Sequence, residues 1–215
     1  MLTISEEVLL LFLDDEKGTF IRGPDIHVEL AMSGAVLMDL AFANRIDTDP
    51  ERLFVVDQSP VGDRVLDDLL SRIAATEPER STEYWLNWIR EDVPDIMGHF
   101  IDRLVEKGIL RRMEEKILWV FETRRYPVID DREEREVKRR ITSVLFSDEI
   151  PDPRDVVIIG IVNACDLLDV ILHHREVDKV RGRAEQISQM DFIGQAINST
   201  INDVRASILS MISTM

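Results

Sequence analysis

Residues 2–18, LTISEEVLLLFLDDEKG, decide how the fold begins. Thr3 and Glu6 form a capping box, in which a threonine oxygen and a glutamate carboxylate satisfy backbone amides at a helix start. The apolar run 8–13 follows at once and predicts a helix that is buried on nearly all sides rather than along one stripe. The polar residues 14–18 end this helix. Since the chain opens with a buried helix, we expect no leader or flexible tail ahead of it.

The composition predicts one folded domain. The chain has 215 residues, of which 45% are apolar, 6% are aromatic and only 9 are glycine, a balance that favours a helical core over disorder. We therefore expect a single domain over residues 1–215. No stretch resembles a signal peptide or reaches the ~18 apolar residues of a membrane span. The single cysteine, Cys165, excludes an internal disulfide. These features predict a soluble, cytoplasmic protein.

The charge of the chain is strongly acidic and unevenly placed. The formal net charge is −16, yet residues 103–140 hold 12 Lys/Arg against 9 Asp/Glu. An acidic chain is repelled by nucleic acid and by anionic membranes, so binding to either would depend on a local basic patch. Only residues 103–140 supply such a patch, and an ordinary solvated helix face is the alternative interpretation. We expect no nucleic-acid partner.

Hydrophobic periodicity and helix-ending residues predict a mainly α fold, a compact helical domain with one or two small β-hairpins. Further helices are expected over residues 26–43, 65–73, 84–89, 94–108, 131–146, 153–174, 176–189 and 191–213. One hairpin is expected from residues 45–46 and 53–56, and a second from 109–110 and 117–121 around a turn at 113–115. Residues 39–46 and 102–109 align at one offset, which suggests two winged-helix-like modules or a chance match.

Five segments together resemble the Golgi phosphoprotein family. They are residues 2–18 (LTISEEVLLLFLDDEKG), 33–46 (SGAVLMDLAFANRI), 59–73 (SPVGDRVLDDLLSRI), 100–110 (FIDRLVEKGIL) and 163–172 (NACDLLDVIL). The resemblance covers nearly the whole chain. It implies a compact helical domain without enzymatic activity or cofactor. Eukaryotic members bind phosphatidylinositol 4-phosphate on Golgi membranes and hold cargo enzymes there.

The lipid pocket of that family is not retained in this sequence. The family uses a tryptophan and three arginines, and an ungapped alignment places Pro24, Ser33, Pro94 and Met97 at those positions. A phosphorylated inositol head group needs several cations, so the lipid specificity of the family is not carried over. Arg22, His27 and Arg90 lie near these positions in the sequence, either as replacements or as ordinary surface charges.

The resemblance also implies a self-association hairpin over residues 109–121. Its apolar residues are Ile117, Leu118, Trp119 and Val120, and we expect a homo-oligomer formed through them. Four cations surround the same segment, namely Lys107, Arg111, Arg112 and Lys116. They predict weak, salt-sensitive contact with anionic phospholipid or a phosphoinositide.

Other candidate sites are weaker. Asp169 and His173 are four residues apart, and one helix would place both toward a single metal ion, but no second ligand pair supports this, so we expect no metal. Cys165 lies among apolar residues and is expected to be a buried thiol rather than a nucleophile. No acid–base pair or glycine-rich phosphate loop is present. These observations predict a protein that is not an enzyme.

Two functions follow from the sequence. The first is a non-enzymatic adaptor, peripheral on the cytoplasmic face of a membrane, with an anionic lipid and a protein cargo as partners. The alternative is a bacterial-type protein–protein interaction module without lipid binding. The four missing pocket residues and the charge of −16 favour that alternative.

Overall fold

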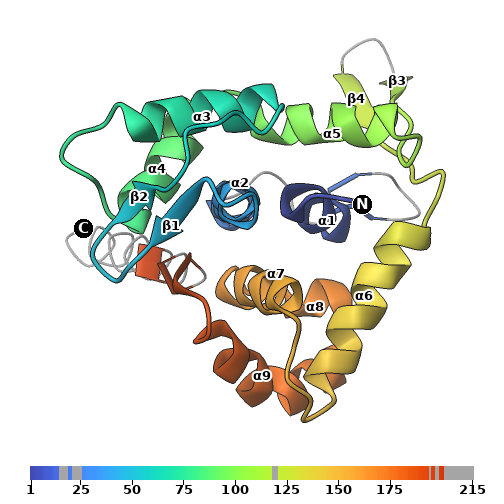
Figure 1. The fold of residues 1–215 in the computed structure, drawn as a ribbon. Coiled ribbons are helices and arrows are strands. Elements are labelled where there is room, and N and C mark those ends of the chain that lie inside the picture. Colours follow the sequence, from blue (N-terminus) through green and yellow to red (C-terminus); the bar gives the residue numbers. More distant parts are fainter. Residues whose placement is uncertain (15–18, 21–25, 118–120, 194, 197–198, 201–215) are drawn as a thin grey trace, which may run out of the picture.

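The computed structural model describes residues 1–14, 19–20, 26–117, 121–193, 195–196 and 199–200. They form a mainly α-helical fold with two small antiparallel hairpins, as predicted. Helices α1 (Ile4–Leu11), α2 (Ile26–Phe42) and α7 (Pro153–Ala164) occupy the centre. Helices α3 (Arg64–Ala74) and α5 (Ile96–Glu106) cover one side of this centre in Figure 1.

The remaining helices complete the layers around the centre. They are α4 (Thr82–Asp92), α6 (Arg132–Leu145), the single turn α8 (Leu168–Ile171) and α9 (His174–Ser188). Helix α4 packs on α2, while α9 packs on α7 and contacts α6 (Figure 1). One cluster of buried apolar side chains runs from Leu2 to Ala196 and so joins these layers. In the part of the chain that the structure describes, no helix is long and apolar enough to cross a membrane.

Helix α1 confirms the prediction made from its capping box. Thr3 Oγ1 accepts a hydrogen bond from the Glu6 backbone N–H at 3.2 Å, and Glu6 Oε2 accepts one from the Thr3 N–H at 2.8 Å. Every residue of α1 is buried, including Glu6 and Glu7. Because α1 contacts α2, α5, α6 and α7, it has no face left for solvent.

The first hairpin, β1 (Ile46–Thr48) with β2 (Leu53–Val55), also agrees with the prediction. Asn44 stops α2 with a positive φ of 56°, the left-handed conformation that asparagine tolerates. The hairpin packs on α4 through the hydroxyls of Thr48 and Thr82, 2.9 Å apart.

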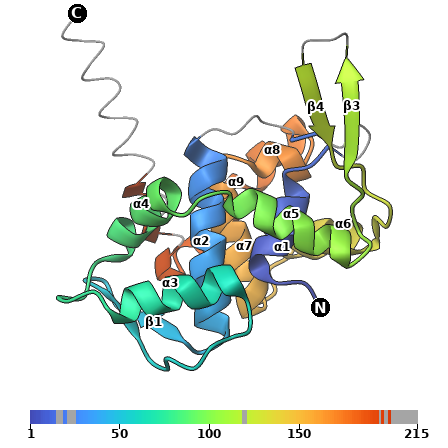
Figure 2. The same ribbon diagram turned by 90° about the horizontal axis from the view of Figure 1, so that it is seen from above.

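The second hairpin differs from the prediction. Its strands are β3 (Met113–Ile117) and β4 (Phe121–Arg125), so the residues expected to form the turn, 113–115, are part of a strand. Leu110 and Val128 form a bridge at the base of the hairpin. The strand pairs, from Met113 opposite Arg125 to Ile117 opposite Phe121, keep the register of that bridge. This buried base therefore sets the pairing, rather than the apolar run 117–121. Figure 2 shows the hairpin projecting from the helical body.

The constant offset between the two predicted modules also fails. Both modules contain a helix followed by a hairpin, but β1 begins four residues after the end of α2 and β3 seven residues after the end of α5. Residues 109–111, which the offset would make the first strand of the second module, precede β3.

The long helix predicted over residues 153–174 is interrupted. Helix α7 ends at Ala164, Asp166 takes a positive φ of 56°, and α8 forms a separate turn before α9. Asp169 lies in α8 whereas His173 caps α9. The prediction that one helix would hold both residues is therefore wrong. The part of the final predicted helix beyond residue 200 lies outside the described residues.

Candidate functional site

His27 and Arg90, the predicted replacements for the family's lipid-pocket residues, both reach neighbouring helices. His27 lies in the first turn of α2, and its Nδ1 is 3.0 Å from the Cys165 carbonyl oxygen at the end of α7. This contact places the ring proton on Nδ1. Arg22 and Pro24 lie outside the described residues.

Arg90 is held by carboxylates of its own chain. Its guanidinium pairs with Glu91, and Nη1 lies 4.0 Å from Glu29 Oε2 on α2. The side chain is 20% exposed, and its buried Nε has no hydrogen-bond partner among the described residues. Arg90 is therefore positioned beside α2, as its proposed replacement role requires, but its charge is already matched by acidic neighbours.

The positions aligned with the family's arginines have structural roles here. Ser33 is fully buried, and its hydroxyl donates to the Glu29 carbonyl at 2.9 Å. Met97 packs against the core, and Pro94 precedes the start of α5. Asp95 caps α5, with Oδ1 accepting from the Gly98 N–H at 3.1 Å. The amino end of α5, where a helix dipole favours an anion, thus already holds a carboxylate.

The four predicted rim cations are not equally available. Lys107 Nζ donates to Glu6 Oε2 at 2.6 Å, and Arg112 pairs with Asp102. Of the rim side chains that the structure describes, Arg111 alone forms no ion pair; its backbone N–H donates to the Pro127 carbonyl at 3.1 Å. The side chain of Lys116 is outside the described part of the chain.

The self-association residues can be placed only in part. Ile117 ends β3 opposite Phe121 in the ladder. Leu118, Trp119 and Val120 lie outside the described residues. The projecting position of the hairpin agrees with a contact surface, although it does not test one (Figure 2).

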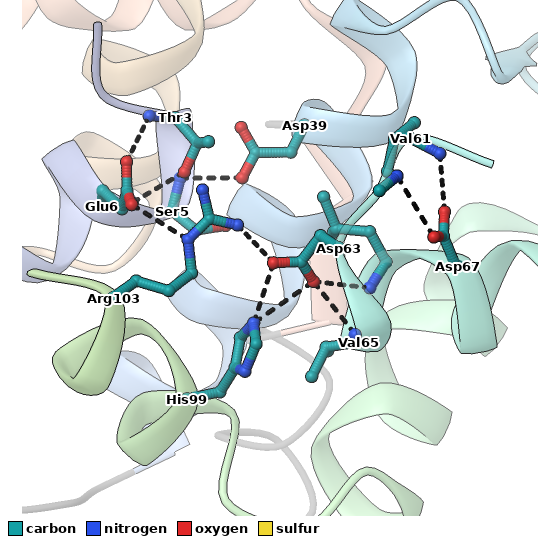
Figure 3. Close-up of polar contacts among 12 residues, drawn as sticks. Thr3, Ser5, Glu6, Asp39, Val61, Asp63, Val65, Asp67, His99 and Arg103 are labelled. Carbon is teal, nitrogen blue, oxygen red and sulfur yellow. Dashed lines mark hydrogen bonds and ion pairs between the residues drawn. The ribbon is translucent and has the colours of Figure 1, made fainter. Parts of the chain in front are cut away.

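A buried charged network joins α1, α3 and α5 (Figure 3). Arg103 on α5 donates from Nε to Glu6 Oε1 at 3.0 Å, and its Nη1 donates to Asp63. His99 Nε2 lies 2.9 Å from Asp63 Oδ2. Asp63 also accepts from the N–H groups of Val65 and Leu66, which makes it the amino-terminal cap of α3. One carboxylate therefore starts a helix and also contacts the side chains of His99 and Arg103.

The pKa of Asp63 reflects two opposed effects. Burial alone acts to raise it, but hydrogen bonds from His99 and the Leu66 N–H, together with Arg103, outweigh burial and lower the pKa below its ordinary value. Asp63 is therefore held as a carboxylate at neutral pH, a state that suits a structural anion beside the Arg103 guanidinium.

A second network anchors the opposite side of α1. Glu7 accepts hydrogen bonds from Arg154 Nε at 2.8 Å and from Arg140, and Arg140 also donates to Asp155 at 2.7 Å. These contacts connect α1 to α6 and α7. Neither network was predicted from the sequence, although a buried helix that carries Glu6 and Glu7 requires cationic partners.

Two weaker predictions from the sequence concern the Cys165 thiol and a metal site. Cys165 is a buried thiol, as expected. Among the residues described, no group of three or more His, Cys, Asp or Glu side chains is arranged to hold a metal ion.

Comparison with known proteins finds a family match and curated relatives. Residues 4–204 match the family described as Golgi phosphoprotein 3 (GPP34). Vacuolar protein sorting-associated protein 74 of Eremothecium gossypii is 33% identical over 165 residues. That match covers 67% of this chain and 49% of the relative, so the chain spans about half the length of the curated relative it matches.

Proposed function

The chain belongs to the Golgi phosphoprotein 3 (GPP34) family, and from this membership we propose that it is a non-enzymatic adaptor that binds peripherally to a membrane. The match over residues 4–204 carries the proposal. The relative is named for protein sorting, which supports a protein cargo as the second partner. We place the protein in the cytoplasm, on the cytoplasmic face of that membrane.

The membrane contact that we propose is electrostatic and weak. It lies beside the projecting β3–β4 hairpin, where Arg111 is exposed and unpaired within the described chain. Arg112 can add to it, because its partner Asp102 is exposed and such pairs contribute little. Lys107 contributes less, since Glu6 engages it. Each cation near an anionic surface contributes on the order of 1 kcal/mol, so binding should weaken as salt increases.

A stereospecific head-group pocket is not part of this proposal. Glu29 and Glu91 already neutralise Arg90, Ser33 is buried, and Asp95 occupies the amino end of α5. A phosphoinositide should therefore bind no better than another lipid of equal charge.

Vesicle flotation tests the proposal. Three vesicle types are compared at low and high salt, containing phosphatidylinositol 4-phosphate, phosphatidylserine at matched charge, or phosphatidylcholine alone. We expect flotation with both anionic vesicles at low salt and its loss at high salt. Arg111→Glu should abolish it, whereas Arg139→Glu, the same change at an exposed residue of α6, should not.

The alternative is a protein–protein interaction module without lipid binding. The net charge of −16 and the pairing of Arg90 with acidic residues favour it. Absence of flotation with all three vesicle types would support this alternative. Selective flotation with the phosphoinositide that survives high salt would contradict both proposals.

A further inference from the structure

A pocket of about 520 Å³ lies between the end of α7, α8 and α9. Its wall contains charges of both signs above an apolar floor formed by Leu168 and Val177. The charged residues that line it are Asp166, Asp169, Asp178, Arg175 and Arg181. This volume falls in the range of small-molecule sites.

Four of these charges have no partner among the residues that the structure describes. Arg175, Asp178 and Arg181 follow one another at three-residue intervals along α9, a spacing at which opposite charges on a helix can pair. Yet these three side chains and that of Asp166 form no ion pair or hydrogen bond within the described chain, and all four are exposed. Elsewhere, exposed arginines such as Arg132 and Arg135 do pair with aspartates close by in sequence.

The two helix termini that border the pocket favour opposite charges. Asp166 directly follows the carboxyl end of α7, where the helix dipole is negative and favours a cation. Arg175 lies in the first turn of α9, where the dipole is positive and favours an anion. A pocket polarised in this way suits a ligand that carries both charges.

We propose that this pocket binds a phosphate–ammonium zwitterion of the phosphoethanolamine type. The guanidinium groups of Arg175 and Arg181 bind the phosphate, because their planar donors match phosphate oxygens. Asp166 binds the ammonium group, and Leu168 and Val177 contact the carbon chain between the charges. Inorganic phosphate alone would face the carboxylates uncompensated, and ethanolamine alone would face the arginines.

This inference goes beyond the proposed function, because it holds for the soluble zwitterion whether or not the protein binds membranes. Calorimetric titration of the full chain compares phosphoethanolamine, inorganic phosphate and ethanolamine. We expect phosphoethanolamine to bind at least about tenfold more tightly than either fragment, a difference that one charge-assisted contact can supply. Absence of binding, or equal binding of phosphate alone, would overturn the inference.

Variants identify the site. Arg175→Gln with Arg181→Gln should abolish binding, while Asp166→Asn should reduce the preference for phosphoethanolamine over phosphate. Asparagine keeps the left-handed backbone that position 166 requires. Lys179→Gln, an exposed residue of α9 outside the pocket lining, is the control and should bind as the unmodified chain does. Equal loss of binding in the control would place the ligand elsewhere.

A second arm distinguishes the two sources of the ligand. Flotation is measured with phosphatidylcholine vesicles that contain or lack phosphatidylethanolamine, both without net charge. Flotation that requires phosphatidylethanolamine and the two arginines assigns a lipid head group. Binding of soluble phosphoethanolamine without flotation assigns a free metabolite. Both outcomes uphold the pocket.

Discussion

Asp39, in the last turn of α2, caps the first residue of α1. Its Oδ1 accepts a hydrogen bond from the Ile4 N–H at 2.6 Å, and its Oδ2 accepts one from the Ser5 N–H at 3.1 Å. Thr3 satisfies the next amide, that of Glu6. A helix start leaves its first N–H groups without intrahelical partners, and α1 is buried too deeply for water to replace them. The two central helices are therefore joined by a cap.

This arrangement predicts that Asp39→Ala destabilises the protein strongly and Asp39→Asn only mildly. Alanine leaves two buried N–H groups unsatisfied, which should cost about 2 kcal/mol or more. Asparagine keeps one acceptor oxygen and turns its NH2 toward the other N–H, but it also removes a buried charge, so it should cost about half as much as alanine. Urea unfolding of both variants measures the difference. Equal costs would mean that the Asp39 hydrogen bonds do not stabilise α1.

Removal of Arg103 should cost far more than removal of Arg112. Arg103→Ala leaves Glu6, which has no exposed surface, with Lys107 as its remaining cation, and also removes a charged hydrogen bond from Asp63, so it should cost about 2 kcal/mol. Arg112 pairs with Asp102 at the surface, where such pairs contribute less than about 1 kcal/mol. Denaturant midpoints of the two variants test this ranking, and similar midpoints would refute it.

The pH dependence of stability should separate Asp63 from Asp39. The folded pKa of Asp63 is lowered below the ordinary 3.8, so its stabilisation is present above pH 3.8 and is lost as pH falls from there through the folded pKa. Burial raises the pKa of Asp39 above 3.8, against hydrogen bonds from Ser5, Ile4 and Thr3 that act to lower it. Its contribution is therefore most favourable at low pH and declines as pH rises through the folded pKa.

Urea unfolding from pH 3 to pH 7 compares the unmodified chain with Asp63→Asn and Asp39→Asn. The stability advantage over Asp63→Asn should shrink on acidification below about pH 3.8. The advantage over Asp39→Asn should instead shrink as pH rises above that value. Parallel pH profiles for both variants would contradict the opposite shifts.

Local sequence signals predicted most helix boundaries because capping depends on neighbouring residues. Thr3 with Glu6, Asp63, and Asp152 before Pro153 all begin helices where expected. The break at Asp166 was missed since no glycine or proline marks it; this aspartate itself takes the left-handed conformation.

Long-range contacts account for the remaining errors. The second hairpin takes its register from the bridge between Leu110 and Val128, which apolar content along the strands cannot reveal. The Glu6–Arg103 pair joins residues 97 positions apart, so no local pattern announces it. Glu6 and Glu7 inside a buried helix indicate that cationic partners exist, but the sequence does not indicate which residues these partners are.

Gly98→Ala and Gly182→Ala should change stability in opposite directions. A Cβ at position 98 would fall well inside the van der Waals radius of the Asp95 carboxylate that caps α5, whereas a Cβ at position 182 in α9 meets nothing within 4 Å. Loss of the Asp95 cap should cost about 1 kcal/mol. Alanine at position 182 should stabilise α9 by about 0.5–1 kcal/mol. Thermal unfolding measures both, and stabilisation by Gly98→Ala would show that Asp95 is not a required cap.

We expect the protein to self-associate through residues 109–121, where the β3–β4 hairpin leaves the helical body (Figure 2). Ile117 ends β3, and the sequence continues with the apolar residues Leu118, Trp119 and Val120, a composition that favours association between copies. Sedimentation velocity of the unmodified chain should therefore show an oligomer, and Trp119→Asp should shift it toward monomer. The matched control is Tyr84→Asp, at an exposed aromatic residue of α4. Trp88 is not suitable as a control, because it packs against the core and its replacement would disturb folding. A monomer in the unmodified chain, or dissociation by the control as well, would exclude the hairpin as the interface.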